Sequence, residues 1–540
     1  MTVLRSKYKF HGGLHLPERK TPASDQRIQD CSMPETLTIP LNMHAGVDAV
    51  PLVRAGQSVN FGQKIAQAEG FVSSDIHSPC NGVIEAIETR PIASRSGLDE
   101  LVIVIKTNPM SEHGQVEQAS EDEVQPVRTM IEALSLRQSQ IQLAIAESGI
   151  VGLGGAGFPT ATKIKSSEQA NNLLINGAEC EPYICCDDRT MRDHADAVLG
   201  GAFLISKASG CAYIEIAIED NKPEAISSME AAIERLPSHM QRAVKVIICP
   251  TLYPSGGERQ LLNIITGKEI QSGQYPASIG YQVQNVGTAL AVFEMLTLNQ
   301  PLVSRIVTVT GDAVSKPGNY RVPIGTSVKH LLEQAGFDES NCRTVVHGGP
   351  MMGYPIADTE RPITKLTNCI IAASVEEMPE LATEQPCVRC GQCAEVCPVR
   401  LLPQQLFWFS RSEEFDKAEQ FKLPDCIECG LCAYVCPSNI PLVDYFRFAK
   451  SEMKKQSLAR IKSDKSKIRF DARNDRLEQE QLEKARIKAE KAKLRAQKRQ
   501  QGADTDAKSD AVAAALARVK AKKQQSQGQL NLEQEPDNES

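Results

Sequence analysis

The chain has 540 residues, of which 41% are hydrophobic and 24% are charged, and its formal net charge is −7 at pH 7. This length is enough for about three or four domains with room for bound cofactors. The chain has no run of about eighteen apolar residues, so a membrane-spanning helix is not expected, and the negative net charge argues against a nucleic-acid-binding protein.

Residues 1–110 are predicted to form a small β-sandwich domain with an N-terminal extension. Between residues 40 and 106, short apolar strands alternate with glycine turns. Their order resembles the barrel-sandwich hybrid fold of biotinyl and lipoyl carriers. Carriers present a modifiable lysine at the hairpin tip, whereas the tip here, residues 69–75, has none. A scaffold role is therefore predicted, with His44 and His77 as ordinary histidines rather than ligands.

Residues 127–298 are predicted to form an α/β domain, which follows an acidic and polar linker at residues 111–126. Helical patterns alternate there with apolar strands at residues 172–176, 212–218 and 244–248. Such alternation is typical of a sheet covered by helices.

A glycine-rich loop, G-L-G-G-A-G-F-P-T at residues 152–160, lies near the start of this domain. It contains G-x-G-x-x-G, but a helical pattern precedes it and Pro159 interrupts the segment after it, so a Rossmann fingerprint is not predicted. The glycines permit positive φ and close approach of the backbone, so N–H groups can face a phosphate or an aromatic ring system. The loop is therefore a candidate cofactor site.

Residues 304–373 form the next predicted unit. A strand pattern at residues 305–311 and a helical pattern at residues 328–335 stand in an order that resembles the β-grasp domain of the soluble-ligand-binding (SLBB) class.

Residues 380–450 carry eight of the seventeen cysteines, in two runs that both read C-x2-C-x2-C-x3-C-P. Three thiolates at this spacing can hold one face of an iron–sulfur cube, and the fourth, before proline, ligates the other cube. We therefore expect two [4Fe-4S] clusters: cluster one on Cys387, Cys390, Cys393 and Cys436, and cluster two on Cys426, Cys429, Cys432 and Cys397. Zinc normally uses two separated cysteine pairs and fits the runs poorly. Disulfides are not expected, because the first ten residues are not signal-like and the thiols should be in a reducing compartment.

Residues 451–540 are predicted to form a basic helical tail, partly disordered and ending in low-complexity sequence. Lysine and arginine outnumber acidic residues up to residue 500, and apolar residues are few. A solvated spacer is the favoured interpretation, and a contact with anionic lipid or a partner is the alternative.

The glycine loop, with Lys163 and the later N-G-A-E-C-E-P segment at residues 176–182, resembles the FMN site of the flavoprotein subunit of respiratory complex I. The order of all the domains resembles the RnfC family, which differs from complex I in carrying two clusters after the flavin domain. The chain departs from the complex I pattern at Leu153, Ala161, Ala178 and Cys180, where complex I has Arg, Gly, Asp and Ser. The contacts implied for FMN are Gly152, Gly154, Gly155, Gly157, Lys163, Asn176, Glu179, Asn285 and Thr288, and those implied for NADH are Phe158, Glu181 and Glu258.

The resemblance implies a multidomain α/β plus α+β protein that acts as the NADH-oxidising, electron-input subunit of a membrane-bound ion-translocating oxidoreductase. FMN would be non-covalent, and the chemistry would be borne by cofactors without a catalytic side chain. The implied partners are the other subunits of an Rnf-type complex and a ferredoxin or redox-sensor acceptor, and the implied location is peripheral, at the cytoplasmic face of the bacterial inner membrane. Two alternatives remain open: an iron–sulfur relay without flavin, and a ligand-binding adaptor built on the β-grasp domain.

Overall fold

The computed structural model describes residues 3–92, 99–108, 128–167, 169–380, 382–500 and 509–528. The chain divides into two units, Met1–Glu452 and Met453–Ser540. The predicted linker at residues 111–126 and the end of the tail from residue 529 lie outside the described residues. Among the described helices, none is both long and apolar enough to cross a bilayer. The predicted domain boundaries stay a prediction.

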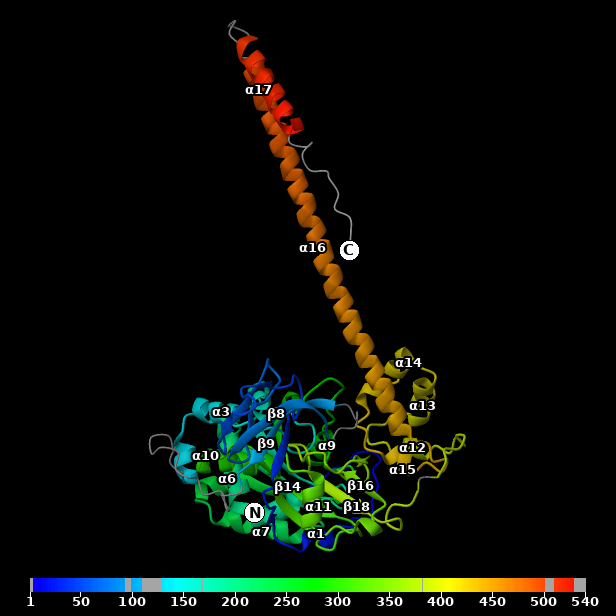
Figure 1. Cartoon of the computed structure of the whole chain (residues 1–540). Helices are drawn as coiled ribbons and strands as arrows, with labels where there is room; N and C mark the ends of the chain where they lie inside the picture. The colour runs from blue at the N-terminus through cyan, green and yellow to red at the C-terminus, as the bar shows by residue number, and fades with distance from the viewer. Residues whose placement is uncertain are drawn as a thin grey trace, which may run out of the picture. The chain divides into compact units, whose positions relative to one another are not determined.

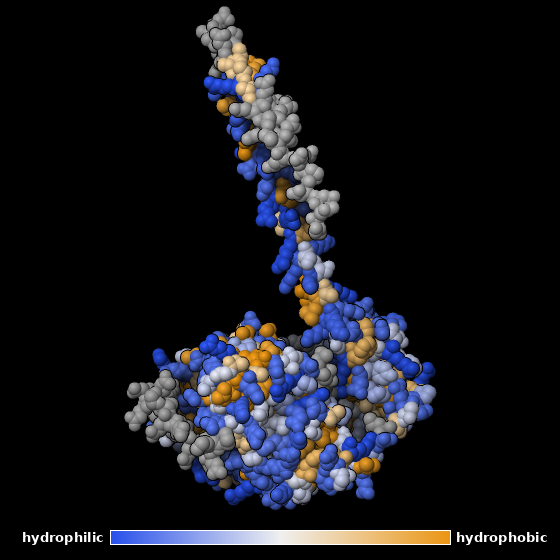
Figure 2. Space-filling model, in the orientation of Figure 1, coloured by the Kyte–Doolittle hydropathy of each residue, from blue (hydrophilic) through white to orange (hydrophobic). Residues whose placement is uncertain are grey.

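The predicted barrel-sandwich hybrid is present as two small antiparallel sheets, and Figure 1 labels two strands of the larger one, β8 and β9. One sheet has the order β3-β9-β8-β5 and the other β4-β6-β7. Leu37, Ile39, Ile65, Ile84 and Ile103 fill the space between them and are fully buried. Figure 2 shows hydrophobic residues gathered on the surface where Figure 1 labels β8 and β9. The strands are β3 (Thr36–Pro40), β4 (Val50–Pro51), β5 (Ser58–Val59), β6 (Lys64–Gln67), β7 (Ile76–His77), β8 (Gly82–Pro91) and β9 (Asp99–Thr107).

The predicted α/β domain contains a parallel sheet in the order β1-β12-β11-β10-β13. Its strands are β1 (Val3–Arg5), β10 (Asn172–Gly177), β11 (Tyr213–Glu219), β12 (Val244–Cys249) and β13 (Tyr281–Asn285). The helices are α2 (Met130–Ser135), α3 (Gln138–Glu147), α4 (Thr160–Ser166), α5 (Cys186–Asp193), α6 (Ala195–Ser209), α7 (Pro223–Glu234), α8 (Ser238–Gln241), α9 (Glu258–Thr266) and α10 (Val286–Leu298). Because the strands are parallel, the segments that come after β10, β12 and β13 meet at one edge of the sheet.

The β-grasp domain has a sheet in the order β17-β16-β18-β14-β15-β2, and the helix α11 (Val328–Gln334) packs on it. Its strands are β14 (Ser304–Thr310), β15 (Gly318–Pro323), β16 (Thr344–His347), β17 (Tyr354–Ile356), β18 (Cys369–Ala373) and the N-terminal β2 (Gln29–Asp30). A short helix, α1 (Thr21–Ser24), precedes β2. The N-terminal extension thus supplies β1 to the α/β sheet and β2 to the β-grasp sheet, which the sequence did not predict.

The cysteine module consists of two similar loops, each followed by a one-turn helix. Gly391 and Gly430 precede these helices with φ of +85° and +82°, a left-handed conformation that glycine adopts without strain. The helices are α12 (Gln392–Glu395), α13 (Pro403–Arg411), α14 (Phe415–Gln420) and α15 (Leu431–Tyr434). Beyond them the chain is helical, in α16 (Leu442–Gln500) and α17 (Ser509–Gly528), and the side chains described between residues 456 and 498 are exposed.

Candidate cofactor site

The glycine loop forms a tight reverse turn between β-bridge residues. The Gly152 N–H donates to the Phe158 carbonyl at 2.8 Å, and the Gly157 N–H donates to the Gly152 carbonyl at 3.2 Å. Gly155 has φ of +135° and Gly157 has φ of +62°, so both need the freedom of glycine. Gly154 and Gly155 are exposed. The rim of the loop therefore presents main chain, which suits close approach of a phosphate or a flat ring.

The N-terminus of α10 and the strand β14 support this loop from beneath. Thr288, fully buried, accepts a hydrogen bond from the Leu153 N–H at 3.0 Å. Arg305 donates from Nη2 to the Leu153 carbonyl at 2.5 Å. A Cβ on Gly154 would lie 3.3 Å from the Cβ of Asn285. Thr288 thus holds the loop by a hydrogen bond, Asn285 lies beside it, and Arg305 is a supporting residue that the sequence did not reveal.

Lys163 and Glu258, one predicted for FMN and the other for NADH, form an ion pair. Lys163 Nζ lies 2.7 Å from Glu258 Oε2, and the side chains are 25% and 37% exposed. Lys163 belongs to α4, and Glu258 is the first residue of α9. The two helices therefore bring opposite charges together at the same edge of the sheet.

The segment after β10 is held mainly by internal contacts. Asn176 Nδ2 donates to the Gly256 carbonyl at 2.9 Å, and Asn176 Oδ1 accepts from the Ala178 N–H at 3.0 Å. Glu179 is buried and accepts from the Asp187 N–H at 3.0 Å, at the start of α5. The carboxylate of Glu179 therefore serves the fold of this segment.

Glu181, predicted to contact NADH, is oriented toward the β-grasp domain. Its Oε1 accepts from the backbone N–H groups of Met351 at 2.8 Å and Met352 at 2.9 Å. Burial raises the pKa of Glu181, which these hydrogen bonds oppose. This carboxylate thus links the β-grasp domain to the α/β domain that carries the glycine loop, which is called the flavin-type domain below.

Asp187 is a second residue that the sequence did not reveal. Its Oδ2 accepts from Asn285 Nδ2 at 2.6 Å. Burial raises the pKa of Asp187 to about 7; the charge of Glu179 adds to this shift and Arg305 opposes it. A cavity of about 30 Å³ lies against Leu153, Asp187, Gly287 and Arg305. This volume corresponds to about one water molecule, so the space beneath the loop is closely packed.

The cysteine side chains of the two runs fall into two groups. Burial and the neighbouring thiols of Cys390, Cys436 and Cys387 raise the pKa of Cys393. Burial raises the pKa of Cys429 to about 12, with further contributions from Cys426 and Cys397. Cys436 thus neighbours the first run and Cys397 the second, which supports the crossed assignment. Four thiolates in each group are a donor set that suits a [4Fe-4S] cluster.

The cluster-two cysteines lie against the flavin-type domain. Tyr253, which is 3% exposed, donates from its hydroxyl to the Cys429 carbonyl at 2.7 Å. Tyr253, Cys429 and Leu431 form an apolar cluster against which Cys180 and Met351 pack. Cys390 of the cluster-one group is exposed instead. Tyr253 is the third important residue that the sequence did not indicate.

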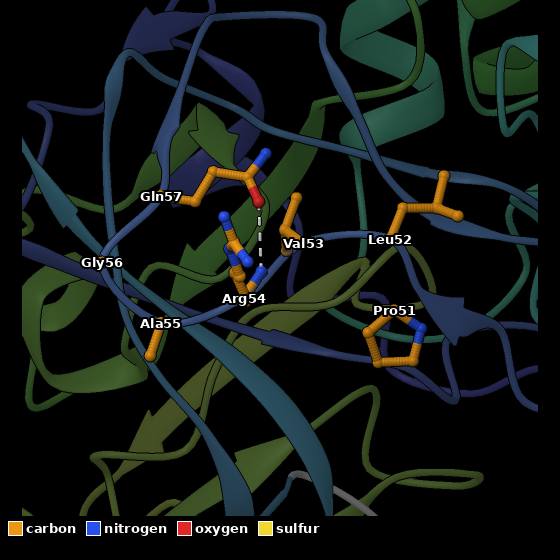
Figure 3. Close-up of a pocket in the computed structure, with 7 residues that line it drawn as sticks. All are labelled: Pro51, Leu52, Val53, Arg54, Ala55, Gly56 and Gln57. Atoms are coloured by element: carbon orange, nitrogen blue, oxygen red, sulfur yellow. Dashed lines mark hydrogen bonds between the residues drawn. The ribbon is translucent and has the colours of Figure 1, made fainter.

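A further hollow in the described structure lies elsewhere, on the barrel-sandwich domain. It measures about 850 Å³ and is lined by the single segment Pro51, Leu52, Val53, Arg54, Ala55, Gly56 and Gln57 (Figure 3). The Arg54 N–H donates to Gln57 Oε1 at 3.2 Å within this turn. None of the predicted site residues lines it, so it is not the cofactor site.

Comparison with protein families gives four consecutive matches along the chain. They are the RnfC barrel sandwich hybrid domain at residues 8–108, the Nuo51 FMN-binding domain at 145–294, the SLBB domain at 306–355 and the 4Fe-4S dicluster domain at 386–440. These matches confirm the predicted fold class.

Curated relatives match across nearly the whole chain. The C subunit of the ion-translocating oxidoreductase complex of Serratia proteamaculans is 42% identical over 516 residues, which are 95% of this chain and 70% of that protein. The corresponding protein of Vibrio cholerae O395 is 42% identical over 521 residues, which are 96% of this chain and 65% of that protein. Among solved structures, an NAD+-reducing [NiFe]-hydrogenase in the H2-reduced state aligns with a TM-score of 0.44 and 20% identity, over 61% of this chain and 63% of that one. The Serratia relative, of which the chain covers 70%, shows that the chain belongs to the RnfC family, the C subunits of ion-translocating oxidoreductase complexes, and the match to the RnfC barrel sandwich hybrid domain agrees with this.

Proposed function

We propose that the chain is the electron-input subunit of an ion-translocating complex, which oxidises NADH through non-covalent FMN and passes the electrons through two [4Fe-4S] clusters. The observation that carries this proposal is the contact between Tyr253 and Cys429, because it joins a predicted cluster ligand to the domain that holds the glycine loop. A proposed flavin site and two predicted iron–sulfur clusters within one packed unit are the parts that an entry point for electrons requires.

The residues of the loop fit FMN. The exposed main chain at Gly154 and Gly155 can approach a ring or a phosphate, and Lys163 supplies a positive charge from the adjoining helix. FMN, when bound, takes a pair of electrons from NADH and can release them singly. The chain's own task is then to position the two ligands. Thr288 and Arg305 hold the loop, and Phe158, half-buried at its end, is the proposed NADH contact within it.

The burial of the cysteines supports a direction for the electrons. Cys429 of the cluster-two group is buried against the flavin-type domain, whereas Cys390 of the cluster-one group is exposed. Cluster two would therefore receive electrons first, and cluster one would pass them on. The proposed acceptors are the other subunits of an Rnf-type membrane complex, with a ferredoxin-like protein or redox sensor beyond them, and the flow would be reversible.

The proposed location is the cytoplasmic face of the bacterial inner membrane, where the subunit would be peripheral. The basic helix α16 supports this proposal, because exposed lysines and arginines are attracted to anionic lipid and to acidic partner surfaces.

Cofactor analysis of the purified protein tests the proposed function. We expect FMN, iron and acid-labile sulfide in the ratio that one flavin and two [4Fe-4S] clusters require, together with NADH-dependent reduction of an artificial dye. A protein with full iron and sulfide that neither retains nor accepts FMN, and that does not reduce the dye, would instead be a flavin-free relay.

A further inference from the structure

The tip of the barrel-sandwich domain, which consists of residues 69–75 and the adjacent residues 45–47, contacts the glycine loop. The Ala45 N–H donates to the Gly157 carbonyl at 2.9 Å, and the Val47 N–H donates to the Val72 carbonyl at 3.0 Å. A Cβ on Gly46 would lie only 2.0 Å from the Val72 oxygen. The two segments of the tip are therefore packed too closely for any side chain at residue 46, and together they touch the loop.

The same tip reaches the helix that carries Lys163. Thr162, the residue before Lys163 in α4, donates from Oγ1 to the Phe71 carbonyl at 3.2 Å. The base of the tip is fixed by Asp75, which accepts from the Ala68 N–H at 2.8 Å and pairs with Lys64 at 2.6 Å. Phe71 is thus held beside the proposed phosphate contact by a braced loop.

The side chain of Phe71 is 77% exposed, the highest exposure of any phenylalanine in the described residues. An isolated exposed apolar side chain is common on proteins and means little alone. Its position gives this one significance, because the backbone of Phe71 is bonded to the helix that begins directly after the glycine loop. The preceding Gly70 has φ of +77° and open space around it, so the ring has room to adjust to a ligand.

We propose that Phe71 is a substrate-contact residue whose ring stacks on the adenine of the dinucleotide, so that the barrel-sandwich domain forms one wall of the NADH site. This inference rests on the proposed function. With the nicotinamide half lying over the glycine loop, the adenine half extends beyond the rim, where an exposed ring is available. Base–aromatic stacking needs only a flat face and excludes water from both partners. The tip, which has no lysine for a carried group, would have a binding role in its place.

The test uses ADP-ribose, which carries the adenine but cannot be oxidised, titrated by calorimetry into the full-length, FMN-loaded protein. Phe71→Ala is expected to weaken ADP-ribose binding about tenfold, within the range for loss of one base stack. Phe71→Trp is expected to restore the affinity. Tyr213→Ala is the matched control. Tyr213 is an aromatic residue that is 53% exposed, and it lies at the N-terminal end of β11, away from the edge of the sheet that carries the proposed site. The FMN content of all variants should equal that of the wild type.

The outcomes separate the two proposals. If the wild type retains FMN and binds ADP-ribose, and Phe71→Ala binds it equally well, the role of Phe71 is refuted while the proposed function stands. If Phe71→Ala and Tyr213→Ala weaken binding alike, the effect is not specific and the inference also fails. If the wild type holds no FMN and binds no ADP-ribose, the proposed function falls and takes this inference with it.

Discussion

Lys163 and Glu258 neutralise each other across the mouth of the proposed flavin site, with 2.7 Å between the ammonium and the carboxylate. The resemblance to complex I assigned the lysine to FMN and the glutamate to NADH, and neither assignment implied that they would pair. A phosphate that binds Lys163 has to compete with Glu258. In the proposed flavin site, the ion pair would therefore oppose binding of the cofactor's phosphate.

Replacing Glu258 with glutamine should tighten FMN binding. A partly exposed pair of this kind is worth up to about 1 kcal/mol, so we expect the Kd for FMN to fall by a factor of roughly two to five. Fluorescence titration of FMN into the apoprotein measures it. Glu360→Gln, which removes the acid from the exposed Lys329–Glu360 pair, is the control and should change nothing. An unchanged FMN affinity with a raised KM for NADH would favour the substrate role that the sequence suggested.

Replacing Gly154 with valine should abolish FMN binding. Space for a Cβ exists only at 3.3 Å from the Asn285 side chain, and the branched methyl groups of valine would be forced into it or across the exposed rim. Gly152→Ala is a graded comparison within the same loop and should retain more FMN, because a Cβ at residue 152 makes only an ordinary contact at 3.5 Å with the Phe158 carbonyl. We expect the Gly154→Val protein to keep its iron–sulfur absorption and lose its flavin. Wild-type FMN content in this variant would show that the loop is not the site.

The features that the sequence predicted are those encoded over short distances along the chain. The crossed cysteine groups follow from two runs of eleven residues each, and the glycine loop from nine neighbouring residues. The orientation of Glu181 toward Met351 joins residues 170 positions apart, and that of Arg305 toward Leu153 joins residues 152 apart. No local pattern specifies such pairs, because they depend on how the domains pack. For the same reason the N-terminal strands β1 and β2 could not be assigned to their sheets.

Lys365 should make stability depend on pH. Burial lowers the pKa of its ammonium to about 7, with the Asp75 carboxylate opposing the shift, whereas the ordinary value is 10.5. Between these values the unfolded chain holds a proton that the folded chain lacks, so stability rises as pH increases from about 7 to about 10. Below pH 7 both states are protonated and the contribution is constant.

The variant Lys365→Met should flatten this rise, as measured by the thermal unfolding midpoint at several pH values. Lys365 Nζ donates to the carbonyls of Asp75 and Gly149, both at 2.7 Å, so the variant should also be less stable at every pH. Only the slope of the unfolding midpoint against pH distinguishes the titration of Lys365 from this general loss of stability. The control is Lys106→Met at an exposed position, which should keep the wild-type slope. A Lys365→Met protein with that same slope would show that the lysine is charged when folded.

The substitution Cys397→Ser should damage cluster two, although Cys397 lies in the first cysteine run. Its thiol neighbours those of Cys426 and Cys429, which are the other predicted ligands. Electron paramagnetic resonance of the reduced protein should show the loss or change of one cluster signal. The paired variant Cys393→Ser should change the other signal. If both variants change the same signal, the two runs are not crossed.

The variant Tyr253→Phe should alter cluster two alone. In the wild type, the Tyr253 hydroxyl donates to the carbonyl of Cys429 and so reduces the negative charge around cluster two. Removing this hydroxyl should therefore shift the reduction potential of cluster two to more negative values. The buried carbonyl left without its donor should also cost roughly 1 kcal/mol of stability.

Tyr320→Phe is the matched control, because the Tyr320 hydroxyl likewise donates at 2.7 Å to a carbonyl, that of Lys316, in the β-grasp domain. A potentiometric titration followed by electron paramagnetic resonance distinguishes the two. If cluster two is the first acceptor, Tyr253→Phe should also slow reduction of both clusters by NADH while flavin reduction stays as fast as in the wild type. A shift confined to cluster one would reverse the proposed order of the clusters.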